Sequence, residues 1–237
     1  MMLVYVSGSE KQIGLLSIPR DTLTETESGS RKKLNAIYAG RKEEGVEDLL
    51  NYVQKYIGYR PDGYIVFNWS LVEQITDAMG GLDVTLDHYI RVHTDGVEVY
   101  VPEGDQHLNG EEMLATLRYR YGYATADIGR TGVQRKVIKA CMEQWVALDK
   151  IPMVPEILAM LQEQSLTNLS NENLLWLAKT VLTSRDAFTT DTLDGSAEYR
   201  NGVSYYVLNP RGIVEQINAD YNPYVDAITL EDLDTVE

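Results

Sequence analysis

The sequence predicts an α/β protein in which a central mixed β-sheet is covered by helices. Short apolar or alternating segments, which are typical of strands, recur along the chain between longer segments with apolar residues at helical spacing. No linker, shift in composition or internal repeat divides the 237 residues, and one large domain of this length can bury a sizeable core. We therefore expect a single domain over residues 1–219, followed by a frayed acidic tail over residues 220–237.

The first expected elements are two strands, at residues 3–6 and 13–18, joined by a polar turn. A proline closes the second strand and places Arg20 and Asp21 at its C-terminal end. Residues 22–32 are rich in Ser, Thr and Glu, a composition that predicts a mobile loop.

Further elements follow from apolar spacing and from local start and stop signals. Asn109 and Glu112 have the spacing of a capping box before an apolar helix. Asp95 and Gly96 stand between two alternating runs and predict a hairpin over residues 90–101. The other helices are expected at residues 33–40, 44–57, 71–79, 131–148, 153–163, 171–183 and 210–219, and the other strands at residues 64–68, 82–86 and 203–208.

Composition and charge exclude several classes of protein. The formal net charge of −15 and the pI near 4.6 argue against a general nucleic-acid binder, which presents a basic face over a whole domain. Cys141 is the single cysteine, so no internal disulfide can form, and its place on an apolar helix stripe predicts a core residue. No apolar run reaches the roughly 18 residues of a membrane span, and no signal peptide is visible. Residues 1–6 resemble a strand already under way, so we expect further sequence before them.

A cluster of basic residues in this acidic chain predicts an anion site. Residues 118–139 hold six of the 21 Lys and Arg residues, namely Arg118, Arg120, Arg130, Arg135, Lys136 and Lys139. A positive site that persists in a negative chain can hold an anion, and the planar guanidinium matches phosphate or carboxylate in a bidentate way. The alternative, a solvated basic face that balances nearby acids, stays open.

The spacing of these arginines predicts how they are presented. Arginines two apart share a face only on an extended segment, so we expect residues 118–123 to be extended, with tyrosines on the opposite side. Helical spacing returns at Val133. Arg130 and Gln134 are then one turn apart at the start of a helix, where free backbone N–H groups and the helix dipole favour anions.

Five segments of the chain form a specific pattern. In chain order they read LLSIPRDT (15–22), KLNAIYAG (33–40), DAMGGLDV (77–84), LNGEEMLATLRYR (108–120) and DIGRTGVQRKVI (127–138). Together they resemble the LytR–CpsA–Psr family of bacterial cell-envelope proteins, over most of the chain. The resemblance implies a mixed α/β fold with helices on both faces of the sheet.

The resemblance also implies an activity and a location. Members of this family are phosphotransferases that move a glycopolymer, such as teichoic acid or capsule, from a polyprenyl pyrophosphate carrier to peptidoglycan, assisted by Mg²⁺. An N-terminal helix usually anchors them outside the cytoplasmic membrane. We therefore expect an extracytoplasmic protein of a Gram-positive bacterium, associated with the membrane only through a segment outside this sequence. An older family label is transcriptional attenuator, but nothing in the sequence indicates DNA binding.

Matching positions carry the family's site residues over to this chain. The arginines that bind pyrophosphate correspond to Arg20, Arg118, Arg120 and Arg130, and the glutamine of the R-x-x-R-Q pattern corresponds to Gln134. Arg20 is added to the arginine cluster by the resemblance alone. Phosphoryl transfer redistributes negative charge over phosphate oxygens, so catalysis is mostly positioning and cationic stabilisation.

The chain departs from the family pattern in two ways. Val133 replaces the second arginine of R-x-x-R-Q, so either Arg135 substitutes for it or that contact is absent. The family's metal-binding aspartates precede residue 1 and lie outside this sequence. Asp21 and Asp127 remain as candidate catalytic carboxylates that either orient the arginines or bind the metal, and the orienting role is favoured. Two functions stay open: the phosphotransferase, and a non-catalytic binder of polyprenyl pyrophosphate or anionic glycopolymer.

Overall fold

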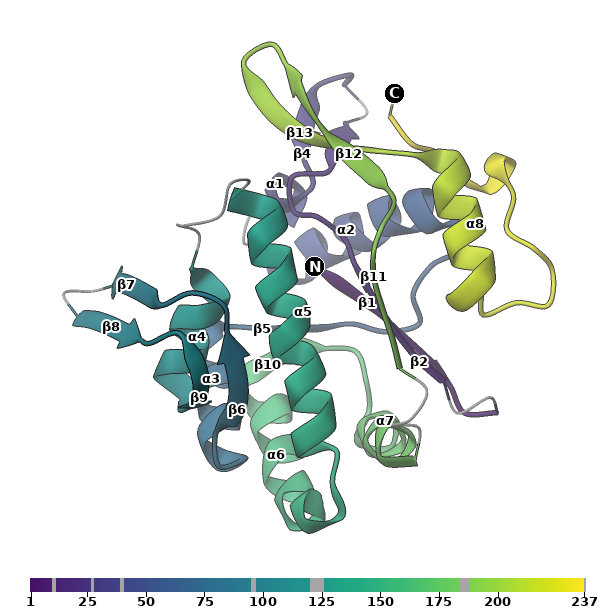
Figure 1. Ribbon diagram of the computed structural model, residues 1–237. Helices are drawn as coiled ribbons and strands as arrows, with labels where there is room; N and C mark the ends of the chain where they lie inside the picture. Colours follow the sequence, from purple (N-terminus) through teal and green to yellow (C-terminus); the bar gives the residue numbers. More distant parts are fainter. Residues whose placement is uncertain are drawn as a thin grey trace. The chain divides into compact units, whose positions relative to one another are not determined.

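The structure is a computed structural model that describes residues 1–9, 12–26, 28–38, 41–94, 97–119, 126–183 and 188–236. The chain divides into two compact units: unit 1 comprises Met1–Tyr64 and Asp186–Glu237, and unit 2 comprises Ile65–Arg185. Unit 2 is therefore an insertion between the two halves of unit 1 (Figure 1). Both units combine helices and strands, which confirms the predicted α/β class.

Unit 1 holds a mixed sheet of the predicted kind. β1 (Met2–Ser7) runs antiparallel to β2 (Gln12–Ser17), and β11 (Phe188–Thr192) runs parallel to β2 on its other side. The other elements of unit 1 are β3 (Leu23–Glu25), β4 (Arg31–Lys33), α1 (Asn35–Tyr38), α2 (Lys42–Ile57), β12 (Gly195–Arg200), β13 (Val203–Leu208), α8 (Pro210–Asp220) and the short 3-10 helix η2 (Leu230–Asp232).

β2 is the central strand of this sheet. Four consecutive residues, from Ile13 to Leu16, are buried, which is typical of a strand covered on both faces. Gly14 allows the chain to come close here, because a Cβ at this position would lie only 2.7 Å from the ring of Tyr221. The core around β2 is completed by apolar residues of α2 and α8, so the end of β2 is held on a rigid base.

The prediction of a mobile loop over residues 22–32 is wrong, because β3 and β4 pair and make most of this segment a hairpin. Thr22, Leu23 and Thr24 are buried, and Oγ1 of Thr24 donates a hydrogen bond to the carbonyl of Lys32 at 3.1 Å. Threonine is well suited to strands. The polar composition therefore reflects a short strand with satisfied hydroxyl groups.

The acidic tail is packed against unit 1 over its described residues, contrary to the expected fraying. Ile228 is buried in the core of unit 1. The side chain of Asn218 in α8 binds both backbone groups of Ile228: Nδ2 donates to its carbonyl at 2.8 Å, and Oδ1 accepts its N–H at 2.9 Å. Burial of Ile228 and its two hydrogen bonds with the Asn218 amide therefore order a segment whose acidic composition suggested disorder.

Unit 2 packs helices against short antiparallel strand pairs. The pairs are β5 (Ile65–Phe67) with β10 (Ser165–Thr167), β6 (Leu82–Leu86) with β9 (Gly104–Leu108), and β7 (Ile90–Thr94) with β8 (Val97–Val101). The helices are α3 (Trp69–Ala78), α4 (Gly110–Arg118), α5 (Ala126–Trp145), the 3-10 helix η1 (Leu148–Met153), α6 (Val154–Gln164) and α7 (Asn171–Thr183). The predicted hairpin is confirmed on both sides of Asp95 and Gly96, which lie outside the described residues.

The core of unit 2 lies between α4, α5 and the strand pairs. Leu82, Ile90, Val101 and Leu108 are almost fully buried in it. Cys141 packs against this cluster, as predicted, and burial raises the pKa of its thiol to about 12. No described helix combines the length and the apolar character needed to cross a membrane.

Candidate functional site

The backbone that follows β2 is held by two other parts of unit 1. The carbonyl of Arg20 accepts the N–H of Asn35 at 3.0 Å, and the carbonyl of Asp21 accepts the N–H of Tyr206 at 2.9 Å. The SIPRDT segment is thereby fixed to the KLNA segment on one side and to β13 on the other. Two of the segments that carry the family resemblance thus meet at one place in the fold.

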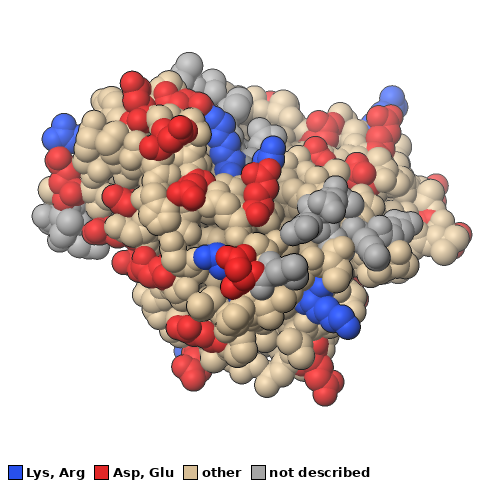
Figure 2. Space-filling model, turned by 60° about the horizontal axis from the view of Figure 1, so that its bottom comes forward, with Lys and Arg blue, Asp and Glu red and all other residues tan. Residues whose placement is uncertain are grey.

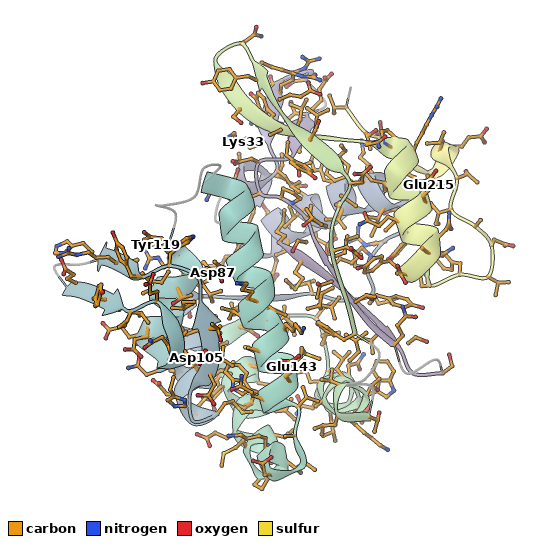
Figure 3. All side chains as sticks on the ribbon, in the orientation of Figure 1. Lys33, Asp87, Asp105, Tyr119, Glu143 and Glu215 are labelled. Carbon is orange, nitrogen blue, oxygen red and sulfur yellow. The ribbon has the colours of Figure 1, made fainter. Side chains whose placement is uncertain are left out.

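Three charged side chains come together at this place. The side chains of Arg20, Asp21 and Lys33 are 41%, 23% and 30% exposed. Oδ1 of Asp21 lies 3.5 Å from Nε of Arg20 and 3.3 Å from Nζ of Lys33, and Nζ of Lys33 also stands 6.0 Å from the centre of the Tyr205 ring. Figure 3 labels Lys33. Two cations share one carboxylate, so the group keeps a positive charge that solvent anions can reach.

Lys33 is a candidate site residue that the sequence did not single out. Residues 22–32 separate it from Asp21, and only the β3–β4 hairpin, in which Lys33 pairs with Leu23, returns it to the end of β2. No local spacing could show this contact. The one available signal was its place as the first residue of the KLNA motif.

Arg118 lies at the end of a helix and not on an extended segment. The predicted capping box is confirmed: Oδ1 of Asn109 accepts the N–H of Glu112 at 2.9 Å, and the N–H of Asn109 donates to Oε2 of Glu112 at 3.0 Å. The helix that it starts, α4, runs through Arg118, and the backbone becomes extended only at Tyr119, with φ −61° and ψ 132°. An exposed arginine in the last turn also complements the negative end of the helix dipole.

The remaining predicted site residues belong to α5 or lie outside the described residues. Arg120 is outside them. The helix begins at Ala126 and not at residue 131, so Arg130 lies beyond the first helical turn, and the expected role of a helix N-terminus does not apply to it. Asp127, Arg130 and Gln134 share one side of the helix by their spacing, but their side chains and that of Arg135 are not among those that the structure describes.

The two lysines of the basic cluster pair with acids on the surface of unit 2. Nζ of Lys136 contacts Oδ2 of Asp87, and this contact lowers the pKa of the Asp87 carboxyl below its usual value. Lys139 lies 3.7 Å from Glu143, four residues along the same helix. Figure 3 labels both acids. For these two lysines, the solvated basic face is the better description.

The described residues do not fit the Mg²⁺ site that the resemblance implies. No three His, Cys, Asp or Glu residues among them are grouped so as to hold a metal ion. Asp21 is a described carboxylate beside Arg20, but its Oδ1 is already shared between Arg20 and Lys33. Mg²⁺ needs several oxygen ligands in a near-octahedral arrangement, so we derive no step through a metal.

Two other segments of the pattern have structural explanations. In DAMGGLDV, Gly80 and Gly81 have φ of 82° and 88°, which other residues rarely adopt. In LNGEEML, the N–H of Gly110 donates to Oδ1 of Asp77 at 2.7 Å, and any Cβ there would collide with α3. These glycines fix the junctions of α3 with β6 and α4, and thereby place the helix that ends at Arg118.

The surface charge sets the background for these cations. Acidic side chains are spread over the face seen in Figure 2, with Lys and Arg in smaller groups among them. The formal net charge of −15 gives a long-range repulsion of polyanions that salt screens over about 10 Å. Anion binding must therefore depend on close contacts with particular cations.

Comparison with known proteins assigns the family. The LytR_cpsA_psr family model matches residues 1–221. The chain is 31% identical over 176 residues to TagV of Bacillus subtilis and 29% identical over 223 residues to TagU of Oceanobacillus iheyensis, both named polyisoprenyl-teichoic acid–peptidoglycan teichoic acid transferases. These alignments cover 71% and 93% of this chain, but only 44% and 68% of the relatives.

A solved structure agrees with this result. The crystal structure of B. subtilis TagV has 26% sequence identity to the chain and a TM-score of 0.76, over 91% of this chain and 84% of that one. The match of the family model over nearly the whole chain, together with these relatives, shows that the chain belongs to the LytR–CpsA–Psr family.

Proposed function

We propose that this chain is the glycopolymer-transferring part of a cell-wall phosphotransferase, which binds a polyprenyl pyrophosphate-linked glycopolymer and transfers it to peptidoglycan. The observation that carries the proposal is the Arg20–Asp21–Lys33 group at the end of β2, in a chain whose relatives are named teichoic acid transferases. The chain spans 44% of one of these relatives and 68% of the other, so the whole activity is part of the proposal.

The proposed reaction exchanges a phosphoanhydride bond for a phosphate ester. A hydroxyl of the peptidoglycan acceptor attacks the phosphorus that carries the glycopolymer, a new P–O bond forms, and the anhydride bond to the second phosphorus breaks. The hydroxyl proton leaves to solvent or a nearby base, and polyprenyl phosphate departs with the bonding electron pair. Negative charge therefore grows on the leaving phosphate, and a cation beside it lowers the barrier.

Arg20 and Lys33 are suited to that task in different ways. The guanidinium of Arg20 can bind two phosphate oxygens at once, whereas the ammonium of Lys33 acts as a compact point charge. Asp21 orients both, and its shared Oδ1 keeps them close together before an anion arrives. We assign Arg118, Arg120, Arg130, Gln134 and Arg135 of unit 2 to pyrophosphate binding, and Asp127 to orienting arginines, as parts of the proposal that rest on the family pattern.

The proposed setting is the outer face of the cytoplasmic membrane of a Gram-positive bacterium, where the acceptor and the lipid carrier meet. It is supported by relatives from Bacillus and Oceanobacillus whose names include peptidoglycan. The acidic charge of the chain gives no support to nucleic-acid binding.

A second candidate function is non-catalytic binding of the same lipid pyrophosphate or of an anionic glycopolymer. It is favoured by one observation: Asp21 is already paired with two cations, which leaves this carboxylate poorly suited to accept a proton from an attacking hydroxyl. A binder needs only the cations, whereas a transferase must also catalyse attack by the acceptor hydroxyl.

A single experiment separates the two functions. The protein is titrated calorimetrically with a short polyprenyl pyrophosphate, with and without Mg²⁺, and release of polyprenyl phosphate from a pyrophosphate-linked glycan is followed in parallel. We expect binding without Mg²⁺ and release of polyprenyl phosphate. Binding without release would favour the binder, and absence of binding would overturn both functions.

Matched variants test the site. Arg20→Ala or Arg118→Ala removes a charge-assisted contact of about 1.5–3 kcal/mol, so affinity should fall at least about tenfold. Arg60→Ala is the control, because Arg60 of unit 1 pairs with Glu47 and Asn51 and has no part in the proposed site. Equal affinity in the Arg20→Ala and Arg60→Ala variants would remove Arg20 from the pyrophosphate site.

A further inference from the structure

The solvent-facing side of the β7–β8 hairpin carries an unusual arrangement of side chains. The register pairs Ile90 with Val101 and Arg91 with Tyr100. Ile90 and Val101 are each 1% exposed and point into the core of unit 2, so the alternate residues face outward. That outward face presents Tyr89, Arg91, His93, Glu98 and Tyr100, all of them exposed.

Two tyrosine rings on this face lie side by side. Tyr89 and Tyr100 are 51% and 55% exposed, their ring centres are 6.0 Å apart, and their planes are inclined by 34°. The hairpin lies at the edge of unit 2 (Figure 1). Single exposed aromatic residues need no explanation, but two neighbouring exposed rings on the same strand face provide an apolar surface with polar groups beside it.

The polar groups beside the rings cancel each other's charge. Nη2 of Arg91 donates to both carboxylate oxygens of Glu98, at 2.8 and 3.1 Å. The face therefore offers hydrogen-bond donors and acceptors without a net charge from this pair. Such a surface suits a ligand that is apolar on one side, rich in hydroxyl or amide groups at its edge, and uncharged along its backbone.

We infer that the Tyr89–Tyr100 face binds the pyranose strand of peptidoglycan, which is the acceptor in the proposed function. The faces of pyranose rings carry C–H groups that stack on aromatic rings, and their hydroxyl and amide groups can bind Arg91 and Glu98. An anionic glycopolymer fits less well, because the Arg91–Glu98 pair offers it no free charge and the chain as a whole is acidic.

The face belongs to the same unit as one of the proposed pyrophosphate ligands. Tyr119, which directly follows Arg118, is 8% exposed and packs into the cluster that contains Ile90 and Val101. Figure 3 labels Tyr119 beside the hairpin. A glycan strand held on the hairpin would therefore be fixed to the element that positions Arg118.

The test measures binding to the glycan without lipid substrate or turnover. Teichoic acid-free peptidoglycan, a soluble β-1,4-linked N-acetylglucosamine oligomer and purified teichoic acid are the three probes. The variants are Tyr89→Ala/Tyr100→Ala, Tyr89→Phe/Tyr100→Phe and, as the matched control, Tyr199→Ala, which alters a tyrosine of β12 that is 78% exposed. A thermal unfolding midpoint close to the parent value shows that each variant is folded.

We expect the double alanine variant to bind peptidoglycan and the oligomer about tenfold more weakly or worse, because two aromatic contacts are lost. The double phenylalanine variant keeps both rings and should stay within about twofold of the parent, as should Tyr199→Ala. Unchanged binding by the double alanine variant, or a loss confined to teichoic acid, would overturn the inference. Equal losses in the alanine and phenylalanine variants would also overturn it, since hydroxyl groups and not ring faces would then carry the contact. Because no lipid is present, failure here is distinguishable from failure of the proposed transfer.

Discussion

Asp21 lies between two cations, and this position determines what its removal should do. In an Asp21→Asn variant, Arg20 and Lys33 lose the carboxylate that lies 3.5 and 3.3 Å away. A partly exposed pair of this kind contributes at most about 1 kcal/mol, so affinity for a pyrophosphate should rise, by up to about fivefold. Turnover should fall, because the guanidinium is no longer oriented. Calorimetric titration and release of polyprenyl phosphate measure the two effects separately.

Asp48→Asn is the matched control for this substitution. Asp48 also pairs with an arginine of unit 1, Arg41, but its side chain is 46% exposed, against 23% for Asp21. It should leave pyrophosphate affinity and turnover unchanged. Asp21→Asn would contradict the orienting role if it behaved like Asp48→Asn in both measurements.

Residues of the candidate site could be proposed from the sequence only where a local pattern marked them. Arg20 and Arg118 stand in recognisable motifs, and the capping box of Asn109 and Glu112 is visible as a spacing. Lys33 acquires its meaning from a contact with Asp21 across a hairpin, and such a contact leaves no signal in a local window. Charge clustering alone was a poor guide, because Lys136 pairs with Asp87, which lies in the connection between β6 and β7.

At the scale of elements, helices with caps and apolar stripes were predicted well, as were the short strands β5 to β8, whereas six other short strands were missed. β3, β4, β9, β10, β11 and β12 have three to six residues each, and several are rich in polar residues. β11 reads FTTDT and is a strand because it pairs with β2 from the other end of the chain. Strand identity of this kind is set by the partner and the face that is buried, not by intrinsic preference.

The two hydrogen bonds between Asn218 of α8 and Ile228 of the tail lead to a second prediction. Asn218→Ala removes two hydrogen bonds to the backbone of Ile228, at 2.8 and 2.9 Å, so that those backbone groups must bind water instead. We expect a loss of about 1–3 kcal/mol in the free energy of unfolding of unit 1. Backbone amides over residues 222–233 should exchange hydrogen faster, because this segment would open before the rest of the unit.

Asn51→Ala is the control for Asn218→Ala. Asn51 lies in α2 of the same unit, and its Oδ1 accepts a hydrogen bond from Arg60 at the surface. This variant should leave exchange over residues 222–233 unchanged. If exchange there were equally slow in Asn218→Ala and the parent, the packing of Ile228 and Leu233 and the contacts of Asp234 with Lys55 would be enough to hold the tail.

The division of the whole molecule into two units could not be predicted from the sequence. Unit 2 is inserted between two stretches of unit 1, and no change in composition marks either junction. The signal is topological: β11 follows the inserted unit and pairs with β2, which precedes it. Local patterns along the chain do not show that the chain goes back to unit 1 after the inserted unit.

The two units should respond differently to alkaline pH. Burial raises the pKa values of Tyr56, Tyr59 and Tyr221 above the ordinary 10.0, and all three belong to unit 1. In unit 2, burial raises the pKa of Cys141 from 9.0 to about 12 and also raises that of Tyr119 above 10.0. Each group stays protonated in the folded state at a pH where the unfolded chain has already lost the proton.

The sign of the effect follows from this difference. The stability that these groups contribute is fully present below the unfolded pKa and is lost as pH rises towards the folded value. Each group can change the free energy of unfolding by about 1.4 kcal/mol per pH unit. Above pH 10, Tyr56, Tyr59 and Tyr221 should therefore lower the stability of unit 1 by up to about 4 kcal/mol per pH unit, whereas Cys141 and Tyr119 should together lower that of unit 2 by up to about 3 kcal/mol per pH unit.

Two optical signals distinguish the units during such a titration. The three tryptophans, Trp69, Trp145 and Trp176, all lie in unit 2, so their fluorescence reports unfolding of that unit. The ultraviolet absorbance of tyrosinate reports mainly the buried tyrosines of unit 1, with a smaller contribution from Tyr119 of unit 2, as a late, cooperative phase after the exposed tyrosines have titrated. We expect this phase to precede the change in tryptophan fluorescence as pH rises. A smooth titration of all tyrosines, with unit 1 still folded, would mean that water reaches Tyr56, Tyr59 and Tyr221 without unfolding.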